Sequence, residues 1–447
     1  MLRDLEAAVR AYLVPTGKPS DARPSTDFGP SAWQLIFDTE TLMGLGQGLR
    51  VLVCQIRLRD RLRETGLAYD PRTLSADELA KLEGYTAARR VRLRTHREFI
   101  VDVLERILVH RRGLLILYNA GFDLSRIASG HGRVAATRGR DGDVDRSMLG
   151  GVSFAFPGTE LRIQVKRTSA RGAFIRLALG TASTPEKRNR SRGGQMPDHR
   201  GYFVDASTVG GALLGRKLSL RTLAELLGTT HQKSAVDLAG PIDAPLLDYA
   251  ANDVQVTWEC FVALRDRYAA FGLTETPLWR LHSEASLGKA HLREMGITPW
   301  RAMQPEFPSD RSAAILETYY GGRVECGVRA VAVPGCLVDF RSQYPTVSAL
   351  MRMWPYHVAT GIEAEEGDPA ETQAWLDRVT VDDILEPAFW PGLHAIVLVD
   401  PAGCRLPTRA HFAPPRRTPR RRTTSASRNV ALPVRRDRTA QWWTGPA

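Results

Sequence analysis

Apolar residues in the first third of the chain follow two different periods. Residues 33–58 read WQLIFDTETLMGLGQGLRVLVCQIRL, in which a Gly-rich turn separates two apolar strands and predicts a hairpin. Residues 96–113 read HREFIVDVLERILVHRRG, whose apolar side chains recur at helical spacing up to Gly113. The next segment, LLILYNAGFDLSRIA, predicts a buried strand, a turn and the start of a helix. Strands mixed with helices indicate an α/β fold.

The same mixture continues to about residue 272. The predicted elements are a pair of strands (LRIQVKR and AFIRLALG), another strand (GYFVDAST), a short helix (SLRTLAELLG) and a long helix (APLLDYAANDVQVTWECFVALRDRYAAFG). Residues 181–200 are polar and predict a loop. We therefore expect one α/β domain over residues 31–272, preceded by a leader of residues 1–30.

Asp38 and Glu40 stand at the end of the first predicted strand. Strand side chains alternate between the two faces, so these two carboxylates project from the same face. Two carboxylates at short range repel each other and lose hydration near a core, which costs several kcal/mol if they stay unpaired. The pattern therefore requires a metal ion, an arginine, or water at an exposed strand end.

Three further residues can join this pair. Asp123 lies in the turn that leads from a buried strand into a helix, and Tyr249 and Asp253 share one face of the long helix. Four carboxylates on buried elements suit the hydrolysis of a phosphodiester by two divalent ions about 3.5–4 Å apart. Mg²⁺ and Mn²⁺ prefer carboxylate oxygens as ligands. We expect two Mg²⁺ (or Mn²⁺) ions as cofactors.

The segments FDTET, YNAGFD and YAAND occur in this order over some 215 residues. They resemble the Exo I, Exo II and Exo III motifs of the DEDD 3′–5′ exonucleases, which share a ribonuclease H-like fold. The tyrosine four residues before the last aspartate is typical of the tyrosine subclass. The other subclass would have a histidine where this chain has Asp248.

The resemblance also implies a role for each motif residue. Asp38 would bridge both metal ions, and Glu40 and Asp253 would hold the ion that carries the water. Asp123 would serve the second ion, and Tyr249 would position the water. Asn119 would contact the DNA primer terminus, and Phe122 is a further candidate for nucleic-acid binding.

A second signature lies downstream. Asp339 follows an apolar run in GCLVDFRSQYPTV, which predicts a strand ending at a sharp turn. The stretch resembles motif A of family B DNA polymerases, DxxSLYPS, although Gln343 replaces the usual aliphatic residue. The resemblance implies that Asp339 binds the catalytic metal ions of a palm domain, and that Ser342 and Tyr344 lie at the incoming nucleotide.

Upstream of this motif, the segment YYGGR resembles the YxGG element that joins the exonuclease and polymerase domains of this family. Its candidate DNA contacts are Tyr319, Gly321, Gly322 and Arg323. Glycines there let the backbone approach phosphates closely. The resemblance to a family B DNA polymerase covers about residues 31–360. It implies a connector over residues 273–335 and an incomplete α+β palm over residues 336–412.

Charge is concentrated at the C-terminal end of the chain. Residues 405–447 hold eleven arginines and one acid, so they contribute +10 of the net charge of +12. Residues 413–447 have no apolar periodicity and predict a disordered tail. The abrupt change of composition after LPTRAHF is typical of a shifted or truncated reading frame. The alternative is a DNA-binding tail with salt-sensitive affinity.

Composition narrows the remaining choices. Five scattered cysteines without a CxxC pair indicate reduced thiols, and we expect a cytoplasmic protein with neither signal peptide nor membrane segment. The expected partner is DNA, as a single-stranded primer 3′ end, with deoxynucleotides only if a complete palm existed. Polymerase chemistry is doubtful because no KxxxNSxYG or YxDTDS segment follows motif A. Two alternatives remain, a stand-alone ribonuclease of the same fold and a non-catalytic nucleic-acid-binding relic.

Overall fold

The computed structural model describes most of the first 300 residues and several shorter segments after them. The described residues are 29–42, 46–135, 137–138, 144–145, 147–170, 172–178, 199–237, 240–298, 303–308, 311, 328, 331–336, 338–340, 342–359, 361, 363, 367–392, 396–399 and 441–444. Those up to residue 296 form one compact unit, and those after it belong to a second unit. None of the described helices is both long enough and apolar enough to cross a bilayer.

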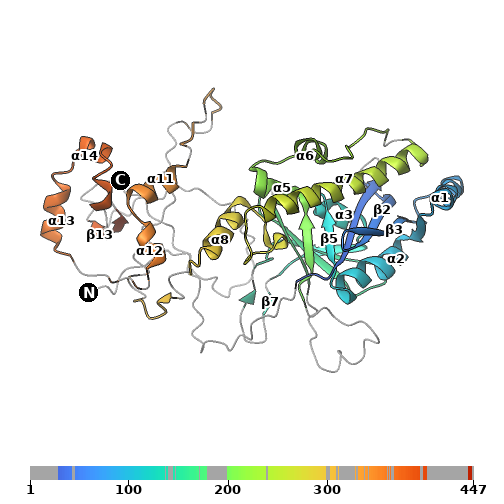
Figure 1. The fold of residues 1–447 in the computed structure, drawn as a ribbon, viewed down its shortest axis with the longest axis horizontal. Helices are drawn as coiled ribbons and strands as arrows, with labels where there is room; N and C mark the ends of the chain where they lie inside the picture. Colours follow the sequence, from blue (N-terminus) through green and yellow to red (C-terminus); the bar gives the residue numbers. More distant parts are fainter. Residues whose placement is uncertain are drawn as a thin grey trace. The chain divides into compact units, whose positions relative to one another are not determined.

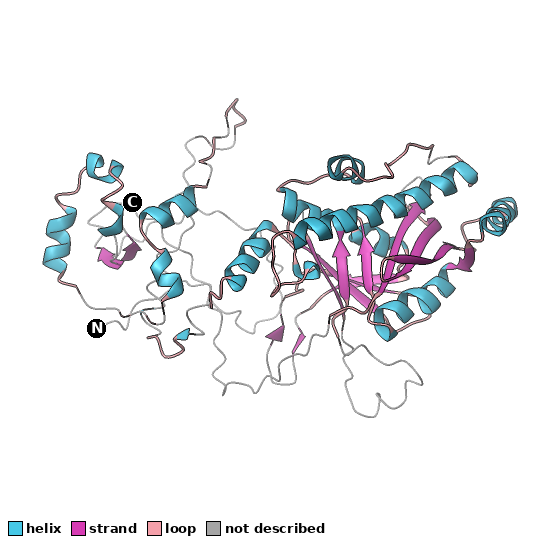
Figure 2. Ribbon diagram, in the orientation of Figure 1, coloured by secondary structure: helices cyan, strands magenta, loops and turns pink. Residues whose placement is uncertain are grey.

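The first unit is built on a mixed six-stranded sheet (Figures 1 and 2). The strands, in sheet order, are β12 (Tyr202–Asp205), β5 (Leu114–Leu117), β1 (Trp33–Thr41), β2 (Leu49–Leu58), β3 (Arg61–Tyr69) and β4 (Arg92–Thr95). Strand β1 pairs antiparallel with β2 and parallel with β5, and β12 pairs parallel with β5. The parallel strands β1, β5 and β12 therefore end at the same edge of the sheet.

The predicted hairpin of residues 33–58 is confirmed, and it extends into a third strand that the sequence analysis missed. Arg59 and Asp60, both at positive φ (49° and 66°), form a tight turn from β2 into β3. Two successive residues at positive φ match the twist of antiparallel strands. Helix α1 (Ala76–Arg89), capped by Ser75 and Glu78, then leads to the edge strand β4.

The helix predicted over residues 96–113 divides into α2 (His96–Glu98) and a π-helical segment, η1 (Phe99–His110). Thr95 and Glu98 form the capping box at its start. Six apolar residues of η1 are buried, which confirms the amphipathic pattern; they are Phe99, Ile100, Val103, Leu104, Ile107 and Leu108. Helix α3 (Ala120–Arg126) follows β5, as the sequence predicted.

A smaller antiparallel sheet packs near these helices. Its strands, in order, are β11 (Ala173–Leu177), β10 (Arg162–Arg167), β9 (Val152–Ala155) and β6 (Gly130–Arg133). The predicted pairing of LRIQVKR with AFIRLALG is confirmed, with Val165 opposite Ile175. A separate two-stranded pair joins β7 (Thr137–Arg138) to β8 (Val144–Asp145). The predicted loop at 181–200 lies, except for its last two residues, outside the described residues.

The remaining helices of the first unit follow β12. They are α5 (Ala206–Leu214), α6 (Leu220–Leu227), α7 (Ala244–Ala269) and α8 (Glu284–Glu294), with a short 3₁₀ turn, η2 (Leu278–Arg280), before α8. Ser219, Asp243 and Ser283 cap α6, α7 and α8, and the Ser283 cap confirms the sequence prediction. Figure 1 shows the long helix α7 crossing the strands of the large sheet.

Two apolar clusters cover the opposite faces of the large sheet. Ile36 belongs to the cluster under α5, α6 and α7, whereas Leu35 and Phe37 belong to the cluster that includes η1, α3 and the smaller sheet. Successive side chains of β1 therefore point to opposite faces of the sheet, in agreement with the period-two pattern of the sequence. The unit continues beyond the predicted boundary at residue 272, because Glu294 of α8 accepts hydrogen bonds from Thr274 and Ala290 is buried.

The second unit contains short elements. They are α11 (Gln343–Leu350), α12 (Trp354–Val358), α13 (Pro369–Leu376), α14 (Val381–Leu385), η3 (Trp390–Gly392), β13 (Ile396–Val399) and β14 (Gln441–Thr444). The strand predicted around GCLVDF is wrong for its described residues, which adopt no regular structure. Val338 and Phe340 are 82% and 76% exposed, and no described strand pairs with them to satisfy their backbone groups.

The disorder predicted for residues 413–447 is wrong for β14, which pairs antiparallel with β13. Its sequence, QWWT, contains the aromatic and β-branched residues that favour strands. The rest of that tail, the strand predicted around GGRVECGVR apart from Val328, and the leader up to residue 28 lie outside the described residues.

Candidate metal centre

Strand β1 presents Asp38 and Glu40 on the face that α7 covers. Ile36, two residues earlier, packs in the cluster of that face, so the strand alternation carries the two carboxylates toward the helix. Asp38 is paired with Val53 and Glu40 with Val51 of β2, which fixes the backbone of the strand end. Both side chains are half-buried. The strand end is therefore not fully exposed to solvent.

Helix α7 delivers the third carboxylate. Its N-cap Asp243 accepts a hydrogen bond from Leu246 N at 3.0 Å, which sets the register of the helix. Asp253 is 1% exposed, and Tyr249, one turn earlier, is half-buried. One carboxylate oxygen from each of Asp38, Glu40 and Asp253 lies within 4.8 Å of the others. It is the one such group of three among the described residues.

Asp123 lies beside this group without belonging to it. It is 2% exposed, and its Oδ1 accepts hydrogen bonds from Thr39 N at 3.2 Å and Thr39 Oγ1 at 2.7 Å. Thr39 is the residue between the two acids of β1, so this contact attaches α3 to the site strand. The charge of Asp38 helps to raise the pKa of Asp123, so the fourth predicted carboxylate lies beside the centre.

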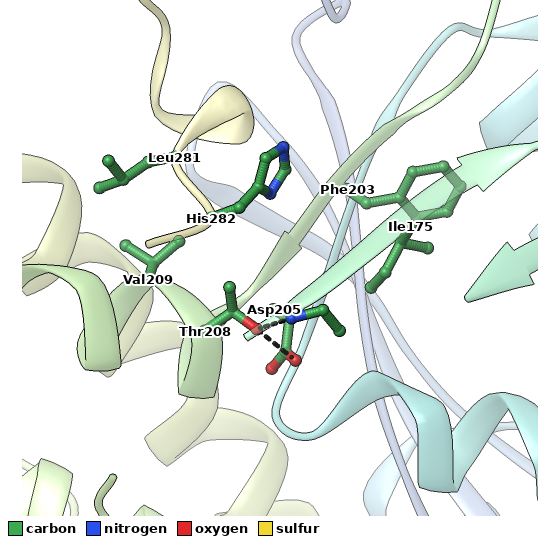
Figure 3. A pocket seen from close by; sticks show the side chains of 8 residues that line it. Ile175, Phe203, Asp205, Thr208, Val209, Leu281 and His282 are labelled. Atoms are coloured by element: carbon green, nitrogen blue, oxygen red, sulfur yellow. Dashed lines mark hydrogen bonds between the residues drawn. The ribbon is translucent and has the colours of Figure 1, made fainter. Parts of the chain in front are cut away.

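The turn before α3 is held by Asp205 at the end of β12. Asn119 has a positive φ of 59°, and its backbone N–H donates to Asp205 Oδ1 at 2.8 Å. Figure 3 shows the small pocket beside Asp205, lined also by Thr208 and His282. Thr208 Oγ1 donates to Asp205 Oδ2 at 3.0 Å and accepts from Ala173 N. These bonds give the pocket a structural role in placing α3.

Burial and mutual repulsion raise the pKa values of the site carboxyls. Burial, together with the charge of Asp253, raises the pKa of Asp38 to about 6. Burial, together with the charges of Asp38 and Asp253, raises the pKa of Glu40 to about 8. The pKa of Asp123 is raised well above its ordinary value by burial and by Asp38. Without a bound metal ion, the centre thus retains protons near neutral pH.

The positive partner in the structure is a lysine, which the sequence analysis missed. Lys233 Nζ donates to Asp253 Oδ2 and lies 4.8 Å from the ring centroid of Tyr249. Although burial opposes its charge, hydrogen bonds to Asp253 and Tyr249 raise the pKa of Lys233. Lys233 stands in HQKSAVD between two helices, where no periodic pattern marks it. The one indication in the sequence was the group of acids, whose negative charge requires a positive partner.

One lysine leaves the centre with an excess of negative charge and an unused ligand atom. Asp253 Oδ1 is buried and has no hydrogen-bond partner among the described residues. A buried carboxylate oxygen without a partner is costly unless it binds a cation. The donor set consists of carboxylate oxygens, which suits hard divalent ions. Asp38, Glu40 and Asp253 could therefore hold a metal ion.

The two nucleic-acid contacts predicted in this region lie on the exposed side of α3. Asn119 is exposed at the start of the helix, and Phe122 is 36% exposed. The Arg126 guanidinium lies 5.0 Å from the centroid of the Phe122 ring. An exposed aromatic ring next to a cation can stack on a base.

The polymerase candidates are not assembled into a site in the described part of the second unit. Asp339 is exposed in an irregular segment, Ser342 precedes α11 with a φ of 59°, and Tyr344 is 66% exposed in its first turn. No described acid joins Asp339 in a group of three potential ligands. Four predicted DNA contacts lie outside the described residues, namely Tyr319, Gly321, Gly322 and Arg323.

The comparison with known proteins does not assign the chain to a family. No model of a known protein family matches the chain, and no curated protein matches it. The assignment of function therefore rests on the residues and on the geometry of this centre.

Proposed function

We propose that the first unit is a metal-dependent 3′–5′ exonuclease that removes nucleotides from DNA 3′ ends. The observation that carries the proposal is the convergence of Asp38, Glu40 and Asp253 from two elements separated by about 200 residues of sequence, with Asp123 hydrogen-bonded to Thr39 between the two strand acids. A solvated surface would not require such a buried, mutually repelling set. Tyr249, one helical turn before Asp253, completes the predicted constellation.

Each residue has a definite task in this proposal. Asp38 would hold both ions, Glu40 and Asp253 the ion that carries the water, and Asp123 the second ion. Two bound Mg²⁺ ions would supply an activated water and relief of charge at the leaving 3′ oxygen. The Tyr249 hydroxyl would orient the attacking water by a hydrogen bond. Lys233 would fix the orientation of the Asp253 carboxylate through their ion pair.

The ribonuclease H-like class of the fold and descent from a family B DNA polymerase belong to the same proposal. They are supported by the order of the three exonuclease motifs and by the mixed sheet on whose edge they meet. We propose that polymerase activity is absent from this chain, because Asp339 is exposed and belongs to no group of three potential metal ligands among the described residues. Holding two ions for nucleotidyl transfer takes at least two palm carboxylates.

The test is the degradation of 5′-labelled single-stranded DNA by the full chain in Mg²⁺. We expect a ladder that shortens from the 3′ end and that disappears with EDTA. Asp38→Ala should abolish the ladder, since it removes the residue that both ions share. A ladder of equal rate from Asp38→Ala would refute the proposal. Cleavage of RNA but not DNA would instead identify the stand-alone ribonuclease.

A further inference from the structure

The segment that carries Lys233 is anchored on both sides of the lysine. It runs between α6 and α7, and its backbone is bound by side chains of both helices. Asn252 Nδ2 donates to Gln232 O at 2.8 Å, and Arg221 Nη2 donates to Ser234 O at 3.1 Å. These two bonds hold the residues immediately before and after Lys233.

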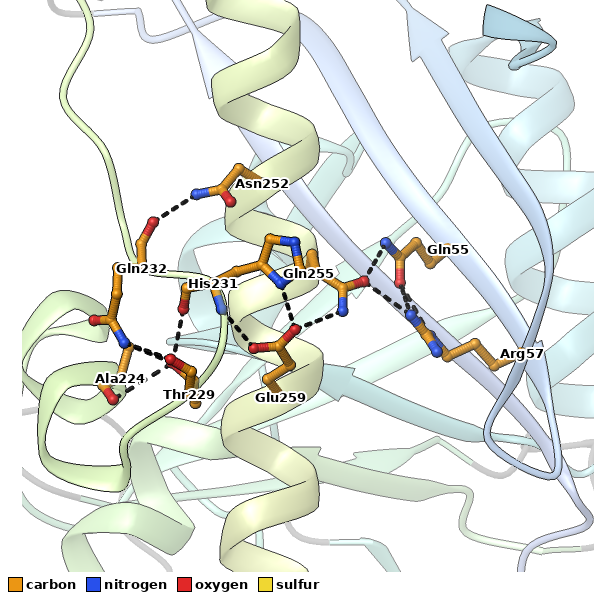
Figure 4. A network of polar contacts seen from close by, with 9 residues as sticks. All are labelled: Gln55, Arg57, Ala224, Thr229, His231, Gln232, Asn252, Gln255 and Glu259. Atoms are coloured by element: carbon orange, nitrogen blue, oxygen red, sulfur yellow. Dashed lines mark hydrogen bonds and ion pairs between the residues drawn. The ribbon is translucent and has the colours of Figure 1, made fainter.

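Glu259 of α7 makes a third anchor (Figure 4). Its Oε2 accepts from His231 N at 2.8 Å, and its Oε1 contacts His231 Nδ1 at 2.6 Å. The same Oε1 accepts from Gln255 Nε2 at 2.8 Å. Both carboxylate oxygens are therefore used, and two of these bonds hold the backbone and the ring of one residue.

A relay of side chains connects Glu259 to the strand beside the metal centre. Arg57 of β2 can only donate, and its guanidinium donates to the Oε1 atoms of Gln55 and Gln255. Gln255 must then present its Nε2 to Glu259, which can only accept. Every donor along this chain, from the Arg57 guanidinium to the Glu259 carboxylate, is thus paired with an acceptor. Such a consistent chain fixes the amide orientations and stiffens the whole network.

We propose that Glu259 and Asn252 are positioning residues, which clamp the segment around Lys233 onto α7 and thereby set its ammonium group against Asp253. The inference rests on the proposed function only for its consequence at the metal centre. A lysine side chain has four rotatable bonds, so its position depends on how firmly its backbone is held. The clamp supplies that restraint from residues that do not touch the carboxylate group themselves.

Amine-selective labelling tests the clamp without any metal. In EDTA, we expect Lys233 to react slowly, because its amine is partly buried and hydrogen-bonded to Asp253. Glu259→Ala and Asn252→Ala should raise its labelling rate several-fold, as measured by mass spectrometry of the digested protein. The exposed residues Lys217 and Lys289 serve as internal references that a local change leaves unaffected. Glu225→Gln, an exposed acid on α6, is the matched control variant.

Mn²⁺ affinity tests whether the clamp acts through Lys233. The ammonium competes with a cation for Asp253, so Lys233→Met should bind Mn²⁺ about tenfold more tightly by titration calorimetry. Glu259→Ala should shift the affinity in the same direction. The double variant should match Lys233→Met alone, since a positioning residue has no effect once its target is gone.

The outcomes separate the two proposals. Unchanged labelling of Lys233 in both Glu259→Ala and Asn252→Ala overturns the clamp, whatever the protein does to DNA. Additive effects on Mn²⁺ affinity overturn its action through Lys233. Absence of Mn²⁺ binding in every variant, with faster labelling of Lys233, refutes the metal centre and leaves the clamp supported. A rise in the labelling of all lysines would show that Glu259→Ala disturbs the whole fold. Glu259→Gln, which keeps the side-chain volume, then replaces it. The clamp requires that this variant raise the labelling of Lys233 alone.

Discussion

The two units of the chain differ in what they bury. The first unit has two apolar clusters on opposite faces of its large sheet, and its acidic group lies between that sheet and α7. In the second unit, no residue whose exposure the structure describes is buried, and large apolar side chains such as Val338, Phe340, Val381 and Leu385 are more than 70% exposed. In the first unit, apolar burial can offset the free-energy cost of burying charges. The described part of the second unit has no such apolar burial.

This difference explains where chemistry can be assembled. Bringing four carboxylates together costs free energy, so it requires rigid elements that hold them against their repulsion. Strand β1 is fixed by pairing on both sides, and α7 is fixed by its buried face. Asp339 has neither support in the described structure, although its sequence context resembles that of a catalytic aspartate.

The largest expected difference between the units is the stability lost when one aromatic side chain is removed from each. Phe37 is 1% exposed and stacks edge-to-face with Phe99, so Phe37→Ala should destabilise the protein by about 3–5 kcal/mol. Phe340 is 76% exposed, and Phe340→Ala should change stability by less than about 0.5 kcal/mol. Urea denaturation followed by circular dichroism measures both. Equal losses would show that the second unit has a comparable core.

A smaller effect is expected from shortening the first unit. A fragment of residues 17–296 should keep its cooperative unfolding, because it contains both clusters. A fragment of residues 17–272 lacks α8 with the buried Ala290, and it lacks the bonds from Thr274 to Glu294. We expect it to unfold at lower denaturant, by about 2 kcal/mol. Identical midpoints would place α8 outside the cooperative unit.

The stability of the metal-free protein should depend on pH through the acidic group. The folded chain holds protons on Asp38 up to about pH 6 and on Glu40 up to about pH 8, whereas the unfolded chain releases them near pH 4. The folded state binds more protons in this window, so stability should fall as pH rises from about 4 to 8 and then level off. Denaturation midpoints in EDTA measure the slope. Asp38→Asn with Glu40→Gln should flatten it, and a persisting slope would assign it to other groups.

The smallest of these effects concerns Tyr249. Tyr249→Phe removes one hydroxyl and keeps the ring that packs beside Lys233. We expect exonuclease activity to fall about ten- to a hundredfold, well short of the loss in Asp38→Ala, with unchanged stability. Initial rates on 5′-labelled DNA measure this. A loss as large as that of Asp38→Ala would give the hydroxyl a more central role than water positioning.

Sequence patterns predicted most elements of the first unit because local rules and burial agree there. The period-two pattern of β1 placed Ile36 and Asp38 on one face, and helical spacing placed Tyr249 beside Asp253. Lys233 could not be found in this way, because its position depends on the clamp by Asn252 and Glu259, contacts that no spacing reveals. The strand expected at Asp339 failed because a strand requires a pairing partner, which a local apolar run does not provide.

The most direct test of the account is Mn²⁺ binding to the full chain, with one acid neutralised in each unit. Asp253→Asn should weaken binding strongly, because it removes a charge and alters the buried ligand atom that has no other partner among the described residues. Asp339→Asn should bind as the unaltered chain does, since its carboxylate is exposed and stands outside the group. Titration calorimetry at pH 8 measures both. Equal binding by Asp253→Asn, or a loss confined to Asp339→Asn, would contradict the account.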